Sequence, residues 1–324
     1  MRLWLPLFLV SLLLVKTSRA SDTNEALIEV HLIYDQFTTA ILSSETAWCS
    51  PATLVGPRVF VTAAHCVHLI PDNQMLSVVG PSFRENRHVR AIHMMGDEIA
   101  TDERFFDGES CKRLFEGIQN NAILTLPQLL TCWNNDGSPD LALIEMEDSI
   151  PGKMFTLSSS DSSIGENFRF FRNTDRCAND KGAPSFSLST MPLFGFKNSQ
   201  MIFDARGLTG TNGCKFGGSG GTYFSLLKNE TIQISAIHSG STKDGVTMDI
   251  HGKRVTVPGN VYGGTRVGST TVQSWLKSTA SKEEFSICGV NRKCPEIIFP
   301  GVHHVSVEQT GSFAVCQDSC RLRK

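Results

Sequence analysis

Three residues that lie far apart in the sequence have the side-chain types needed for acyl-transfer chemistry. His65 follows two alanines and the apolar, strand-like run 59–61, and Asp140 begins a second apolar run. Ser219 lies at the centre of the glycine-rich segment 217–221. A histidine can take the proton from a serine hydroxyl, and a carboxylate can hold that histidine in the required tautomer. The order His, Asp, Ser along the chain is one of three orders known for such hydrolase triads.

The elements that must position these residues are predicted to be mainly β-strands. Short segments that are rich in β-branched residues and bounded by turn residues recur along the chain. They are 58–61, 76–79, 89–92, 141–146, 231–237 and 254–257. One helix is predicted after Ser269 and Thr270, either of which can cap it, because Val272, Trp275 and Leu276 follow at helical spacing.

Around the histidine, the aspartate and the serine, the chain resembles the trypsin/chymotrypsin-like serine endopeptidases. The resemblance runs from about Cys49 to Lys277 and includes a stretch, 258–267, that precedes a helix in the family. It implies an all-β fold of two six-stranded antiparallel β-barrels with a C-terminal helix, to which this chain adds a short disulfide-rich extension. It also implies a disulfide between Cys49 and Cys66, behind His65.

The resemblance assigns a chemical role to each triad residue. Ser219 is expected to be the nucleophile, His65 the general base and Asp140 the group that orients the imidazole. The backbone N–H groups of Gly217 and Ser219 are expected to form the oxyanion hole. We therefore expect a secreted serine endopeptidase whose partners are protein or peptide substrates and protein inhibitors. No cofactor is expected.

Two departures from the family pattern bear on activation. The activatable members carry an aspartate just before the serine, which pairs with a new N-terminus after propeptide cleavage, whereas this chain has Gly218. No sequence like Ile-Val-Gly-Gly lies between the predicted signal peptide and Cys49. Because both halves of the activation ion pair are missing, we expect a preformed site without a zymogen switch, as in the V8-like glutamyl endopeptidases.

Residues near the serine also allow an expectation about specificity. Cleavage after Lys or Arg needs a carboxylate at the base of the substrate pocket, but Gly213 stands at that position and Ser239 lies on the predicted pocket wall. His238 matches a histidine that, in the glutamyl endopeptidases and picornavirus main proteases, binds a Glu or Gln side chain. We therefore predict substrate binding by His238, Gly213 and Ser239, with an acidic or Gln residue preferred before the cleaved bond. The alternative is that His238 is a core histidine satisfied by the backbone.

The first residues of the chain predict export. Arg2 precedes the apolar run 3–15, and small residues follow near Ala20, as in a secretory signal peptide. That run is too short to span a bilayer comfortably, so no membrane anchor is expected. Removing residues 1–20 takes the formal net charge from −2 to about −5, and no long basic run indicates a nucleic-acid partner. The predicted domains are 1–20 (signal peptide), 21–280 (peptidase domain, with its two barrels divided near 155) and 281–324 (cysteine-rich extension).

All ten cysteines follow the signal peptide, which predicts an oxidising compartment and up to five disulfides. Cys111 and Cys132 flank a predicted surface insertion, and we expect a disulfide between them to close this loop. Cys177 is the predicted partner of Cys214, with a cysteine of the extension as the alternative. The extension is too short for a core of its own, so two disulfides are expected to staple it against the second barrel. Asn229 begins the single N-x-S/T sequon and is a predicted glycosylation site.

Other functions remain as alternatives at this point. A catalytically silent scaffold of the same fold would act as a secreted binding protein. An esterase would also use such a triad, but the Gly-x-Ser-x-Gly elbow of α/β-hydrolases precedes a long helix, whereas a strand-like segment, 223–227, follows Ser219. No metal site is predicted, because the adjacent His303 and His304 would point to opposite faces of a strand.

Overall fold

The computed structural model describes the two barrels, the helix that follows them and part of the extension. The described residues are 38–42, 49, 52–67, 70, 74–80, 82–95, 139–173, 186–197, 199–205, 219–227, 231–242, 246–250, 253–257, 259 and 261–298. The predicted signal peptide and the cysteine-clipped insertion lie outside this part of the chain. So do several predicted site residues, namely Gly213, Gly217, Gly218, Asn229, Cys111, Cys132, Cys177 and Cys214.

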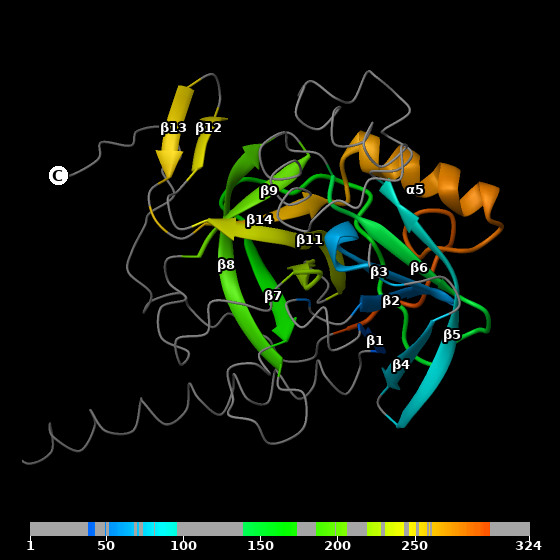
Figure 1. Ribbon diagram of the computed structural model, residues 1–324. Helices are drawn as coiled ribbons and strands as arrows, with labels where there is room; N and C mark the ends of the chain where they lie inside the picture. Colours follow the sequence, from blue (N-terminus) through cyan, green and yellow to red (C-terminus); the bar gives the residue numbers. More distant parts are fainter. Residues whose placement is uncertain are drawn as a thin grey trace, which may run out of the picture.

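Six strands form a closed antiparallel barrel in the first half of the chain (Figure 1). The strands are β1 (Thr39–Ile41), β2 (Ala52–Gly56), β3 (Val59–Thr62), β4 (Met75–Gly80), β5 (Phe83–Met94) and β6 (Ala142–Met146). Their order around the barrel is β1-β2-β3-β6-β5-β4. Strands β2, β3 and β6 are buried along their whole length and are apolar except for Thr53, Thr62 and Glu145.

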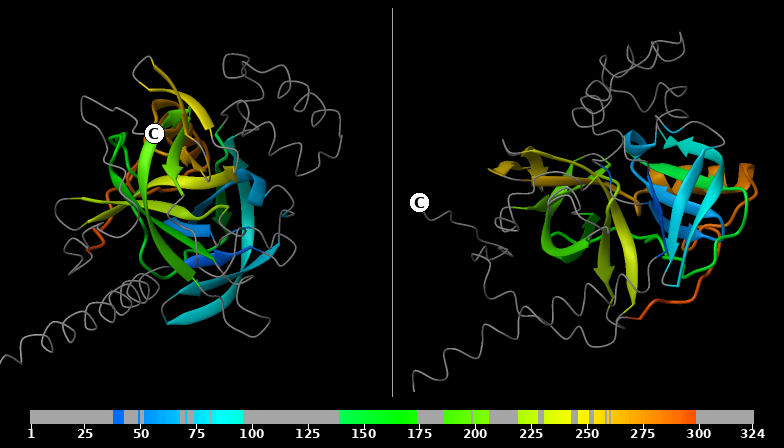
Figure 2. Two further views of the ribbon diagram at one scale, coloured as in Figure 1. Left: turned by 90° about the vertical axis from the view of Figure 1, so that its left-hand side faces the viewer. Right: turned by 60° about the horizontal axis from the view of Figure 1, so that its bottom comes forward.

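Six further strands form a second closed antiparallel barrel, which lies beside the first (Figure 2). They are β7 (Asn167–Asn173), β8 (Phe186–Lys197), β9 (Gln200–Asp204), β10 (Thr222–Leu226), β11 (Ile232–Thr242) and β14 (Val261–Arg266). Their order is β10-β11-β14-β9-β8-β7. The predicted fold of two six-stranded antiparallel barrels is therefore confirmed. The predicted strand 254–257 is also present, as β13 (Lys253–Val257), but it pairs with β12 (Val246–Ile250) in a separate two-stranded sheet.

The predicted C-terminal helix is α5 (Thr270–Lys282). Its N-cap is Ser269, whose hydroxyl accepts a hydrogen bond from the backbone N–H of Val272 at 3.4 Å. The apolar face of the helix, which includes Trp275 and Leu276, belongs to the same core as the first barrel. That core also includes Phe224 and Ile234 of the second barrel, so the helix closes a core that both barrels share.

The extension was expected to pack against the second barrel, but the structure shows that it contacts both. Its Cys288 forms a disulfide with Cys294 and donates its backbone N–H to the carbonyl of Val55 in β2, at 2.8 Å. Further along, the carbonyl of Ile297 accepts a hydrogen bond from Ile232 in β11, at 3.1 Å. Residues 283–298 therefore run from one barrel to the other.

Within the part of the chain that the structure describes, no helix has the length and apolar character needed to cross a membrane.

Candidate active site

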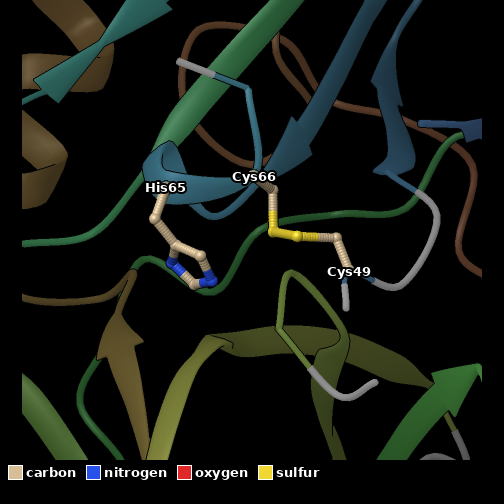
Figure 3. Close-up of side chains that lie close together, drawn as sticks. All are labelled: Cys49, His65 and Cys66. Atoms are coloured by element: carbon tan, nitrogen blue, oxygen red, sulfur yellow. A yellow bond between two sulfur atoms is a disulfide. The ribbon is translucent and has the colours of Figure 1, made fainter. Parts of the chain in front are cut away.

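His65 lies in a short 3₁₀ turn, η2 (Ala64–Cys66), directly after β3. The turn is held from behind by the predicted disulfide between Cys49 and Cys66, which is present in the structure. Figure 3 shows the imidazole and the disulfide extending from the same turn. Only 4 % of the His65 side chain is exposed, so its ring lies in a largely water-excluded environment.

Asp140 reaches His65 because β3 and β6 are neighbours in the first barrel. Thr62 pairs with Ala142, which places the residues after β3 next to those before β6. The Nδ1 atom of His65 lies 2.6 Å from Oδ2 of Asp140, and the backbone N–H of His65 donates to Oδ1 at 3.0 Å. Both carboxylate oxygens therefore bind the same residue, which fixes the imidazole against the carboxylate.

The Asp140 carboxyl is fully buried, and its pKa results from opposing effects. Burial on its own raises the pKa, because it penalises the charged form. The nearby charge of His65 and hydrogen bonds from the His65 ring, the Ser239 hydroxyl and the His65 backbone lower it. The lowering effects prevail, so the pKa of Asp140 lies below its ordinary value and the group is a carboxylate at neutral pH.

Ser219, the predicted nucleophile, is placed by its backbone. It forms a parallel β-bridge with Cys49, whose disulfide partner adjoins His65. The next residue, Gly220, has a positive φ of 79°, a conformation that favours glycine, and donates its backbone N–H to the carbonyl of His238 at 2.8 Å. The backbone of Ser219 thus lies at a tight turn three residues before β10 and next to Cys49, whose disulfide partner follows His65 in the chain.

His238 lies in β11 and is 4 % exposed. The hydroxyl of Tyr223 lies 2.8 Å from its Nδ1 atom. The rings of Phe170 and Tyr262 both have centroids 5.0 Å from the imidazole. The predicted specificity residue is therefore held at one nitrogen by a tyrosine and is surrounded by aromatic rings.

Ser239, predicted to lie on the pocket wall, has a different contact in the structure. Its hydroxyl donates to Oδ2 of Asp140 at 2.7 Å. The pairing of β11 with β14 shifts at this point, since His238 pairs with Gly264 and Gly240 with Gly263, which leaves Ser239 as the extra residue of a β-bulge. A bulge redirects a side chain, and here the redirected hydroxyl supports the aspartate.

Two residues that contribute to the site were absent from the predicted set. Tyr223 holds His238, and Thr265 in β14 exchanges hydrogen bonds with the backbone of Asp140. Thr265 lies within the family-like stretch 258–267, but that match identifies a strand rather than a partner for the aspartate. Tyr223 lies four residues after Ser219 in a strand-like segment, where an aromatic residue is ordinarily read as core.

Among the described residues, one group of side chains has the composition of a metal site. Ligand atoms of Cys49, His65 and Cys66 lie within 4.8 Å of one another. The two sulfurs are bonded to each other, however, and a cysteine binds metal as a thiolate. This group is therefore a disulfide beside an imidazole and does not offer a metal three ligands.

Comparisons with known proteins add the following findings. No protein-family model and no curated protein matches the chain. Among solved structures, the chain is similar to neuropsin, a serine protease expressed in the limbic system of mouse brain (14 % identity, 76 % of this chain and 94 % of that one, TM-score 0.45). It is also similar to a Glu endopeptidase in complex with MPD (12 % identity, 76 % and 91 % of the two chains, TM-score 0.47). The fold itself follows from the strand order and register: two closed six-stranded barrels, with the His65–Asp140 pair on the first and Ser219 on the second.

Proposed function

We propose that the protein is a serine endopeptidase that hydrolyses peptide bonds through His65, Asp140 and Ser219. The observation that carries the proposal is the buried pair formed by Nδ1 of His65 and Oδ2 of Asp140, 2.6 Å apart. A carboxylate held against a histidine in this way fixes the tautomer and stabilises the imidazolium that forms during catalysis. Ser219, bridged to Cys49 at the same end of the barrels, supplies the nucleophile.

The reaction follows from these roles. Ser219 Oγ attacks the peptide carbonyl while Nε2 of His65 takes the hydroxyl proton, and the imidazolium then protonates the leaving amine. Water, deprotonated by the same imidazole, hydrolyses the acyl-enzyme and restores the serine. The backbone N–H groups of Ser219 and Gly217 bind the oxyanion, and losing one such donor costs roughly 3–4 kcal/mol in related chemistry.

The proposal includes a site that is competent without cleavage of a propeptide. Gly218 cannot form the ion pair that switches on the activatable members of the family, and the segment before Cys49 has no matching N-terminal sequence. Support comes from the Asp140 carboxylate, which already accepts hydrogen bonds from the His65 backbone N–H and the Ser239 hydroxyl.

We also propose that His238 selects substrates with Glu or Gln before the cleaved bond. The support is the hydrogen bond between the Tyr223 hydroxyl and Nδ1 of His238, which holds the imidazole in one orientation, as a residue that selects a substrate side chain requires. The test is cleavage of a peptide library, read by mass spectrometry and repeated at several pH values, because histidine titrates near neutral pH. Cleavage after large apolar residues would contradict the assignment.

The last part of the proposal is that the protein is secreted and glycosylated at Asn229. The signal-like segment 1–20, the disulfides Cys49–Cys66 and Cys288–Cys294, and the sequon at Asn229 all fit an oxidising, secretory compartment. Expression in secreting cells followed by N-terminal sequencing and glycosidase treatment tests both parts. We expect an N-terminus near residue 21 and a mass decrease on deglycosylation that Asn229→Gln abolishes. Retention of the full chain inside the cells would contradict export.

The catalytic test is hydrolysis of an unfolded protein substrate by the secreted protein. We expect the wild type to cleave it without prior trimming and the Ser219→Ala variant to be inactive. Folded wild-type protein that cleaves nothing, and whose triad variants behave identically to it, would instead favour a binding scaffold.

A further inference from the structure

Thr265 connects the second barrel to the backbone of the aspartate on the first. The hydroxyl of Thr265 accepts a hydrogen bond from the backbone N–H of Asp140 at 2.9 Å and donates one to the carbonyl of Asp140 at 3.1 Å. Both residues are fully buried. A single hydroxyl therefore satisfies both backbone groups of a residue that lies outside the strand ladder, directly ahead of β6.

The positions of two strands explain how Thr265 and Ser239 reach the same aspartate. Thr265 pairs with Ile237, which lies two residues before the bulged Ser239. The hydroxyls of Thr265 and Ser239 therefore come from neighbouring positions of the β11–β14 ladder. Ser239 binds the carboxylate and Thr265 binds the main chain. The second barrel thus supplies hydrogen bonds to both the side chain and the backbone of Asp140.

The consequence concerns the geometry of the His65–Asp140 pair. A buried backbone N–H or carbonyl that loses its partner pays its full desolvation penalty, so the chain moves to find another partner. Movement of the Asp140 backbone would carry the carboxylate away from Nδ1 of His65, which is 2.6 Å distant. The hydroxyl of Thr265 therefore acts on the imidazole through the position of the aspartate.

We propose that Thr265 is a positioning residue, which couples the docking of the two barrels to the alignment of the His65–Asp140 pair. The inference rests on the proposed function for its catalytic consequence. The structural claim, that Thr265 holds the Asp140 backbone in place, does not depend on whether Ser219 is reactive.

The experiment compares three variants in the full-length secreted protein. Thr265→Val keeps the shape of the side chain and removes the hydroxyl, whereas Thr265→Ser keeps the hydroxyl. Ser235→Ala is the matched control, because its buried hydroxyl donates to Ser225 at 3.0 Å within the second barrel and touches no triad residue. The readouts are kcat and KM on a peptide, the rate of fluorophosphonate labelling, and the downfield proton resonance of the hydrogen-bonded imidazole.

We expect Thr265→Val to lower kcat and the labelling rate roughly tenfold, with little change in KM, since each ~1.4 kcal/mol corresponds to a factor of ten. Thr265→Ser should restore most of the rate, and Ser235→Ala should retain it. The imidazole proton resonance should shift or broaden in Thr265→Val, including in a Ser219→Ala background.

Three results would overturn the proposal: wild-type rates and resonance in Thr265→Val, a Thr265→Ser variant as impaired as Thr265→Val, or an equal loss in Ser235→Ala. A wild-type protein that is never labelled would refute the proposed function instead. In that case the resonance still decides whether Thr265 holds the pair.

Discussion

The two closed barrels have the same topology, because in each the first three strands are followed around the barrel by the sixth, fifth and fourth. They differ in the side chains that fill their cores. The core of the first is mainly aliphatic, with Leu54, Val61 and Leu143 among its fully buried residues. The second barrel has a separate buried cluster that is richer in aromatic residues, in which the rings of Phe203 and Phe170 stack on Tyr223 with centroid separations of 3.9 and 4.5 Å. Aliphatic side chains position their neighbours by packing alone, whereas a cluster that contains a tyrosine can also supply a hydrogen bond.

The predicted triad residues on the first barrel and the predicted specificity residue on the second are positioned in these two different ways. On the first barrel, His65 and Asp140 meet because two paired strands end beside each other. On the second, the hydroxyl of Tyr223, whose ring lies in the core, binds His238. Changes in the second core should therefore reach substrate preference directly, while equal changes in the first core should affect mainly stability.

The largest effect is expected from Asp140→Asn, which breaks the site of the first barrel without changing its shape. The amide would favour the wrong imidazole tautomer, and we expect kcat to fall roughly 10⁴-fold. Steady-state kinetics with circular dichroism as a folding control measures this. A loss smaller than about tenfold would mean that the carboxylate does not orient the catalytic base.

A matched pair of core variants tests the comparison itself. Phe203→Ala and Phe60→Ala should each lower the free energy of unfolding by about 3–5 kcal/mol, because each leaves a cavity in a packed core. Only Phe203→Ala should also alter the preference for the residue before the cleaved bond, since it removes a ring stacked on Tyr223. Denaturant titration and library profiling give the two quantities. An equal change of preference in both variants would contradict the distinction between the cores.

Tyr223→Phe isolates the hydroxyl from the ring. The stacked rings remain, so we expect the free energy of unfolding to fall by only about 1 kcal/mol, as for a single hydrogen bond. Cleavage after Glu or Gln should weaken relative to other residues, because the hydrogen bond to Nδ1 of His238 is lost. An unchanged cleavage profile would indicate that His238 serves the core alone.

The smallest effect at neutral pH concerns the titration of Asp140. Because its pKa in the folded protein lies below the ordinary value of 3.8, ionisation favours the folded state, and this stabilisation is complete above pH ~4–5. It is lost as the pH falls through the folded-state pKa. The difference in unfolding free energy between wild type and Asp140→Asn should therefore be constant near neutrality and change, to the disadvantage of the wild type, in acid. A difference that did not vary with pH would contradict the lowered pKa.

Much of this architecture is predictable from sequence because it depends on local pattern. The apolar runs, the capped helix and the Cys49–Cys66 disulfide all occur as predicted, and the structure brings His65 and Asp140 together. Thr265 could not be identified in this way, because it bonds to a residue 125 positions away and reads as an ordinary strand threonine. The path of the extension was missed for the same reason, since backbone hydrogen bonds to Val55 and from Ile232 leave no signature in composition.

The central claim is that Ser219 is a nucleophile activated by the His65–Asp140 pair without proteolytic trimming. Labelling of the freshly secreted protein with a fluorophosphonate probe, beside the Ser219→Ala variant, tests it most directly. We expect rapid labelling of the wild type and none of the variant. Labelling that appears only after proteolysis would contradict the preformed site, and a folded wild-type protein that resists the probe in every form would contradict the triad.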